Sequence, residues 1–193
     1  MPALFYSPST GGDVLYVAYP SPAPVESVAE HGDVVALYAS GQIVGINVFH
    51  ASKHFALSGN GLIPLPDAAL LETLNSLLQD AGLAPLSLAT SGYRVYEVKK
   101  VEEHPLDEKK SIVTLSDGSK EAVTSTRYRL EAGDRVVALE SGHARGNGTF
   151  FEASVIRNIP QDVEICSEAD LGLGEESKAA YRPTKEIGTD FFA

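Results

Sequence analysis

Two histidines stand where they could share a metal ion. His50 and His54 are four residues apart, and on a helix this spacing places both imidazoles on one face. Neither a glutamate nor a third ligand accompanies them, and Phe49 and Phe55 flank them in a segment with strand and loop composition. The single cysteine, Cys166, excludes an intramolecular disulfide and a multi-cysteine zinc site. We therefore expect no metal and no cofactor, and we expect Cys166 to be a small buried apolar residue.

The residue types needed for nucleophilic catalysis occur without their usual context. Ser52 and Ser167 have neither a nucleophile elbow nor an evident base partner. The glycine-rich segment 142–148 lacks the Gly-Lys-Ser/Thr ending of a P-loop, so it predicts a flexible hairpin. His104 precedes Pro105 and is expected to shape the end of a strand. The sequence therefore predicts a protein that is not an enzyme and has no catalytic residues.

One short segment does combine residue types that bind nucleic acid. Arg127 and Arg129 could contact phosphates, and Tyr128 between them could stack on a base. In the alternative interpretation both arginines lie on an exposed strand end and balance neighbouring acids. The net charge of −11 argues against indiscriminate phosphate binding, and residues 1–89 hold only one basic residue, Lys53. A basic face is possible only in the second half.

The first half has the pattern of a small α+β domain, with a boundary expected near residue 89. Residues 13–19 have strand composition, and residues 33–49 read as a hairpin around a turn at 39–42. Apolar residues spaced three and four apart predict an amphipathic helix over 66–81. The stretch 83–92 is expected to be a linker.

The second half, residues 90–193, changes to short strands separated by turns, and its last 20 residues have the composition of irregular chain that wraps back onto the domain. Five or six strands in about 75 residues are typical of a small closed barrel, and the OB-fold is the obvious candidate. The fold class predicted is therefore two domains, a small α+β domain (1–89) followed by an all-β OB-fold barrel with an irregular C-terminal extension (90–193). The expected strands are 93–101, 111–115, 120–124, 135–140, 150–156 and 162–166.

This second half resembles the tRNA-binding OB-fold domain of EMAP/Arc1p-type and CsaA-like proteins. Arg94-Val95 and His104-Pro105 have the identity and spacing of two anchors in that family's first strand. Ile165-Cys166-Ser167 and Leu171-Gly172-Leu173 resemble its closing loop. Together with a YtpR-like first half, carried by 31–35 and 45–52, the chain resembles YtpR-type bacterial proteins, which join an α+β domain to this barrel.

The resemblance implies a non-catalytic protein that binds tRNA or another structured RNA. Residues 93–165 hold 11 basic and 13 acidic residues, so we expect this binding to be weak and steeply salt-dependent. No apolar run approaches the length needed to cross a bilayer, and the N-terminus lacks the pattern of a signal peptide, so we expect a cytoplasmic protein that associates with no membrane. The resemblance also implies a homodimer as one possible assembly. Glu164 and Asp162 replace residues near the family's RNA site and would repel phosphate. The alternative is therefore a degenerate barrel that acts as a protein-interaction or dimerisation module with little RNA affinity. The RNA-binding residues expected are Arg94, Lys109, Arg127, Tyr128, Arg129 and Ser167.

Overall fold

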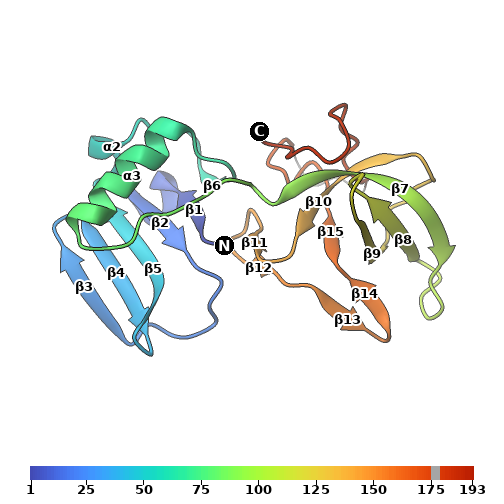
Figure 1. Cartoon of the computed structure of the whole chain (residues 1–193), viewed down its shortest axis with the longest axis horizontal. Coiled ribbons are helices and arrows are strands. Elements are labelled where there is room, and N and C mark those ends of the chain that lie inside the picture. Colours follow the sequence, from blue (N-terminus) through green and yellow to red (C-terminus); the bar gives the residue numbers. More distant parts are fainter. Residues whose placement is uncertain (175–178) are drawn as a thin grey trace. The chain divides into compact units, whose positions relative to one another are not determined.

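The strands of the first ninety residues form one antiparallel sheet (Figure 1), and several of them, such as β1 and β2, are made mostly of apolar residues. The computed structural model describes residues 1–174 and 179–193. The sheet has six strands in the order β3-β4-β5-β2-β1-β6. Their bounds are β1 (Ala3–Tyr6), β2 (Val14–Ala18), β3 (Ser27–His31), β4 (Val34–Ala39), β5 (Gln42–Phe49) and β6 (Gly61–Ile63).

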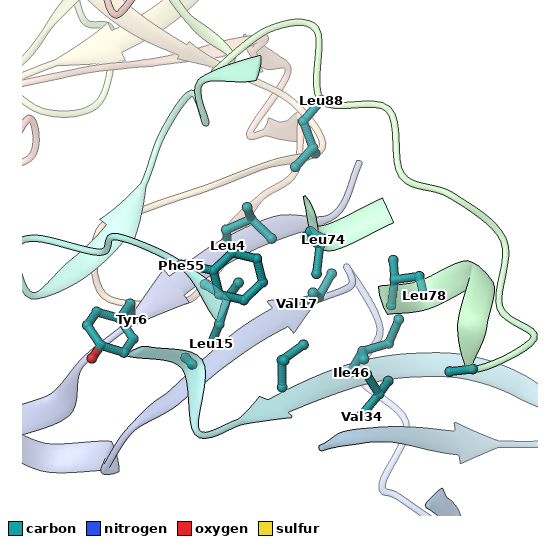
Figure 2. Close-up of a cluster of buried hydrophobic side chains, with 13 residues drawn as sticks. Leu4, Tyr6, Leu15, Val17, Val34, Ile46, Phe55, Leu74, Leu78 and Leu88 are labelled. Carbon is teal, nitrogen blue, oxygen red and sulfur yellow. The ribbon is translucent and has the colours of Figure 1, made fainter. Parts of the chain in front are cut away.

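One long helix, α3 (Ala68–Asp80), packs on this sheet. Asp67 begins it, and its carboxylate accepts a hydrogen bond from the Leu70 amide at 2.8 Å. Leu74 and Leu78, four residues apart, are fully buried and enter the same apolar cluster as strand residues such as Val17 (Figure 2). The helix predicted over 66–81 is confirmed. Two short helices, α1 (Pro8–Gly11) and α2 (Ala51–His54), complete this part.

The predicted strand at 13–19 and the hairpin at 33–49 are also confirmed, as β2 and as the β4–β5 pair. Strands β1, β3 and β6 were not predicted. The predicted linker 83–92 is shorter than expected, because Leu88 is buried in the apolar cluster that α3 covers. Ser91, in contrast, is hydrogen-bonded to Asp190. The chain divides into two compact units, Met1–Ala89 and Thr90–Ala193.

The second unit contains a nearly closed, barrel-like sheet (Figure 1). Its five strands run in the order β15-β10-β7-β8-β9, and every neighbouring pair is antiparallel. Tyr96, Val98, Leu115 and Val136 are among the fully buried residues of its core. The bounds are β7 (Tyr93–Glu103), β8 (Ser111–Ser116), β9 (Glu121–Thr126), β10 (Arg135–Glu140) and β15 (Val163–Ile165).

Two two-stranded hairpins interrupt the chain between β10 and β15. They are β11 (His143–Ala144) with β12 (Phe150–Phe151), and β13 (Ser154–Ile156) with β14 (Ile159–Gln161). The single strand predicted over 150–156 was therefore wrong, since these residues divide between the two hairpins. The remaining predicted barrel strands are confirmed with small changes of boundary.

Side chains close the gap between β9 and the segment leading into β15. The Asp162 amide donates to the Val123 carbonyl at 2.9 Å, and the Asp162 carboxylate accepts from the Val123 amide at 2.8 Å. The Gln161 side-chain oxygen accepts from the Ser125 amide and hydroxyl at 3.1 and 2.9 Å. These contacts replace a regular ladder, so β9 is not left as an open edge.

The C-terminal residues cover the part of β7 that β8 does not reach. The Val95 amide donates to the Thr189 carbonyl at 3.0 Å, and the Gly188 amide donates to the Val95 carbonyl at 2.8 Å. Asp190 fixes the segment by accepting hydrogen bonds from Ser91 and from the Thr90 hydroxyl. The expected extension does wrap back onto this unit, as far as residues 179–193 show it. In the described residues, no helix is long and apolar enough to span a membrane.

Candidate nucleic-acid interface

The turn after β9 presents a tyrosine between two arginines. Leu130 is buried in the barrel core and Tyr128 packs partly against it, while the Tyr128 amide donates to the Thr126 hydroxyl at 3.1 Å. These contacts fix the turn and leave Arg127 and Arg129 exposed. Two exposed arginines therefore flank a partly buried tyrosine in the sequence of this turn.

The loop between β7 and β8 brings two lysines to the same place. Asp107 orders this loop by accepting the Lys109 amide at 3.0 Å on its carboxylate and the Lys110 amide at 2.9 Å on its carbonyl. Together with the turn after β9, the loop forms a groove of about 580 Å³, which we call the basic groove. It is lined by Glu108, Lys109, Lys110, Ser111, Arg127, Tyr128, Arg129 and Leu130.

The basic groove has four cations whose charge is not balanced by an ion pair within residues 1–174 and 179–193. Lys109, Lys110, Arg127 and Arg129 have no carboxylate within ion-pair distance in the part of the chain that the structure describes. In contrast, Lys99 contacts Glu97 at 2.7 Å. A cation without an intramolecular partner is available for a phosphate. Of the six predicted site residues, the structure brings together Lys109, Arg127, Tyr128 and Arg129 here.

Tyr128 also lines two neighbouring hollows. One, the central groove, has a volume of about 950 Å³ and runs past Lys110, Arg127 and Arg145. The other, the inner cavity, has a volume of about 450 Å³ and is lined by Tyr93, Tyr128, Arg145, Glu164, Ser167 and Asp170, among others. The three hollows share Tyr128, and the central groove shares Arg145 and Glu164 with the inner cavity. They form one continuous surface, cationic at the basic groove and richer in carboxylates at the inner cavity.

Ser167, another predicted site residue, belongs to the wall of the inner cavity. Its side chain is buried, and both its amide and its hydroxyl donate to the Asp170 carboxylate at 2.7 Å. It is also hydrogen-bonded to Tyr128, whose pKa is raised, mainly because burial disfavours the phenolate. Burial likewise raises the pKa of the neighbouring Cys166 thiol, which is the buried apolar residue that its sequence context predicts.

Arg94 is placed apart from this surface and is engaged within the protein. Its Nη1 donates to the Gly188 carbonyl at 2.7 Å, and its Nε lies 3.3 Å from Glu140 and 3.9 Å from Asp117. Burial works to raise the pKa of Glu140, but Lys120 and Arg94 outweigh it and the pKa lies below its ordinary value. Arg94 does not line the basic groove. Its charge holds the C-terminal segment on β7.

The two carboxylates expected to repel phosphate have intramolecular partners. Asp162 closes the barrel against Val123, as described above. Glu164 contacts the Nε of Arg145 at 2.6 Å. Arg145 was not among the predicted site residues, because it lies in the glycine-rich segment read as a flexible hairpin. Nothing in the local sequence signals its pairing with a residue 19 positions later.

Two histidines of the first unit, His50 and His54, have a common partner. His50 Nδ1 lies 2.9 Å from one oxygen of Asp33 and His54 Nε2 lies 2.8 Å from the other. Hydrogen bonds from His54 and His50 lower the pKa of Asp33. In residues 1–174 and 179–193, no group of three or more potential metal ligands is assembled.

Comparisons with known proteins link both halves of the chain to other sequences. A family described as a domain of unknown function (DUF4479) matches residues 24–86. A phenylalanine–tRNA ligase beta subunit of Novosphingobium aromaticivorans is 34% identical over 115 residues, which cover 57% of this chain and 14% of that protein. A phenylalanine–tRNA ligase beta subunit of Leptospira borgpetersenii serovar Hardjo-bovis is 25% identical over 116 residues, which cover 60% of this chain and 14% of that protein.

Among solved structures, the crystal structure of a MetRS-related protein from Pyrococcus horikoshii matches with a TM-score of 0.34 and 12% identity, over 50% of this chain and 84% of that one. The two ligase subunits are much longer than this chain, which spans 14% of the length of each. The sequence similarity is therefore to a segment of a tRNA ligase subunit.

Proposed function

We propose that this protein binds tRNA or another structured RNA, without catalysis, through the basic groove of its second unit. The observation that carries the proposal is that Lys109, Lys110, Arg127 and Arg129 line one groove with Tyr128 and have no carboxylate partner among residues 1–174 and 179–193. Such cations with an aromatic ring are the groups by which barrels of this kind hold single-stranded or looped RNA. The similarity to a segment of phenylalanine–tRNA ligase beta subunits supports tRNA as the ligand.

We also propose that the second unit is an OB-fold and the whole chain a YtpR-type protein of the cytoplasm. The strand order β15-β10-β7-β8-β9 and the closure at Asp162 support the first part. The anchors that carry the resemblance have structural roles, because Arg94 holds the C-terminal segment and His104 accepts the Leu106 amide at 3.2 Å in the turn after β7. The proposed RNA surface therefore does not include Arg94, which the sequence predicted to bind RNA.

A titration of fluorescently labelled tRNA at 50 mM salt tests the proposal. The double variant Arg127→Ala/Arg129→Ala removes two phosphate contacts worth about 1 kcal/mol each, so we expect about 30-fold weaker binding. Lys53→Ala, which removes an exposed cation of the first unit, is the matched control and should leave affinity unchanged. Absence of wild-type binding at tens of micromolar protein would sink the proposal, as would an equal loss in the control.

One observation favours a second candidate function, a protein-interaction or dimerisation module. Val155 and Ile156 on β13 are 69% and 57% exposed, although they are adjacent aliphatic residues. Light scattering after size exclusion would report a dimer, and capture from a lysate with and without ribonuclease would report a protein partner. Partners that persist after ribonuclease, combined with no tRNA binding, would favour this function over the first.

A further inference from the structure

The inner cavity has the size and lining of a site for a small ring. Its volume of about 450 Å³ lies in the range of small-molecule sites. Tyr128 and Tyr93 are among its lining residues, and Arg145, Glu164 and Asp170 supply one cation and two carboxylates. Because Tyr128 also lines the basic groove, a strand held there could place one unstacked base in the inner cavity.

The Arg145 side chain is fixed in this cavity before any ligand arrives. Its Nε donates to Glu164 at 2.6 Å, and its Nη1 donates to the Phe150 carbonyl at 3.0 Å and the Thr149 hydroxyl at 3.1 Å. The guanidinium also lies over the Phe151 ring, 5.5 Å from its centroid. A side chain with this many contacts loses little conformational entropy when it binds a ligand.

The polar side chains of this cavity still have atoms that can form hydrogen bonds with a ligand. Glu164 uses Oε2 for Arg145, and Asp170 uses Oδ2 for Ser167, so Glu164 Oε1 and Asp170 Oδ1 have no hydrogen-bond partner in the described residues. Arg145 Nη2 has none in that part of the chain either. The cavity therefore offers carboxylate acceptors and a guanidinium donor, with two tyrosines in its lining.

We propose that the inner cavity binds an unstacked guanine of the RNA held in the basic groove; the proposal rests on the proposed function. Guanine presents two adjacent donors, N1–H and the N2 amino group. One suits the unpaired Oε1 of Glu164, and the other suits Oε2, which accepts from Arg145 but has a second lone pair. The O6 and N7 acceptors of guanine suit an arginine, here Arg145. Adenine would instead turn its N1 lone pair toward the carboxylate. Two acceptors that face each other without a proton between them are unfavourable, so the cavity would discriminate between the purines.

Neutralising Glu164 tests this proposal, because the two interpretations of Glu164 predict opposite changes in RNA affinity. If Glu164 only repels phosphate, neutralising it strengthens binding of every RNA alike. If it accepts from guanine, neutralising it weakens binding only of RNA that contains guanine. Glu152 is the matched control, because it is an exposed carboxylate that lines the central groove and not the inner cavity.

The experiment compares three 11-nucleotide RNAs, each with uridine at every position except the sixth, which is guanosine, inosine or adenosine. With the wild-type protein at 50 mM salt, we expect the guanosine RNA to bind about tenfold tighter than the adenosine RNA. Inosine, which lacks the N2 amino group, should lose a large part of that preference. Glu164→Gln should abolish the preference for guanosine. Glu152→Gln should keep that preference, and it should bind each of the three RNAs as tightly as the wild-type protein does, or slightly more tightly.

Equal wild-type affinity for the three RNAs would overturn the guanine site while leaving the proposed function intact, provided that tRNA binds and Arg127→Ala/Arg129→Ala weakens it. A Glu164→Gln variant that binds the guanosine and adenosine RNAs with the same improvement would also overturn it. If neither tRNA nor any of the oligonucleotides binds, both proposals fail. The inosine comparison uses only the wild-type protein, so it remains decisive even if Glu164→Gln does not fold.

Discussion

The uncompensated cations of the basic groove predict a definite salt dependence. Each phosphate contact contributes about −0.7 to −0.9 to the slope of log affinity against log salt concentration. If Lys109, Lys110, Arg127 and Arg129 each neutralise one phosphate, the wild-type slope is about −2.8 to −3.6. Affinity for tRNA should then fall about 50- to 150-fold between 50 and 200 mM salt.

The double variant Arg127→Ala/Arg129→Ala keeps two of the four contacts. Its slope should be about −1.4 to −1.8, and its affinity should fall only about 7- to 12-fold over the same range. The slope is a more specific readout than affinity alone, because a variant that merely loosens the turn around Tyr128 would weaken binding without halving the slope.

Fluorescence anisotropy of labelled tRNA at four salt concentrations from 50 to 200 mM measures both slopes. Lys100→Ala is the control, because the Lys100 ammonium lies 2.9 Å from Glu102 and removing it breaks an ion pair within the protein. Its slope should equal that of the wild type. A wild-type slope shallower than about −1, or a control slope as shallow as that of the double variant, would refute the assignment of these four cations to phosphate contacts.

Three further predictions concern the framework that positions the groove. Asp190→Ala removes the acceptor for Ser91 and should lower the free energy of unfolding of the second unit by about 2 kcal/mol in urea titrations, after a discount for partial exposure. Burial works to raise the pKa of Asp190, but its hydrogen bonds outweigh burial, and the pKa is lowered. The stabilisation by Asp190 should therefore be complete above about pH 5 and decline as the pH falls through the folded-state pKa. In Asp190→Ala, this pH-dependent loss of stability should be absent. Gly92→Ala should cost roughly 3 kcal/mol or more in the same assay, because Gly92 has a φ of +80° and a Cβ there would lie 2.1 Å from the His143 ring; an unchanged transition midpoint would contradict this. Leu74→Ala should destabilise the first unit by about 2 to 5 kcal/mol by thermal unfolding, because Leu74 is fully buried, with tRNA binding at low temperature retained.

The first half shows which elements a sequence reveals. Helix α3 was predictable because all its signals are local: the cap at Asp67, the apolar spacing, and Gly82 after its end. Strand β3 was missed because four of its five residues are exposed, so it has no apolar alternation. It forms because β4 offers a partner edge, and a pairing of that kind depends on tertiary structure rather than on the strand's own residues.

The candidate site likewise contains residues whose place the local sequence indicates and residues whose role depends on distant contacts. The Arg127–Tyr128–Arg129 turn was predictable because its three residues are adjacent and their types suit RNA. The role of Arg94 was not, because its partner Gly188 lies 94 positions further along the chain. A motif match gives the residue at a position, whereas the contacts made at that position decide whether its charge is available to a ligand.

The acidic composition of the chain does not by itself oppose RNA binding. At physiological ionic strength charges further apart than about 8 Å are largely screened, so a phosphate in the basic groove responds to its immediate neighbours and much less to the net charge of −11. Among the described residues, those neighbours are Lys109, Lys110, Arg127 and Arg129, against the carboxylates of Glu108 in the lining and Asp107 in the same loop. At low salt the screening length grows and distant carboxylates begin to repel the RNA. The plot of log affinity against log salt should therefore flatten below about 20 mM salt, which separates a local cationic groove from a uniformly basic surface.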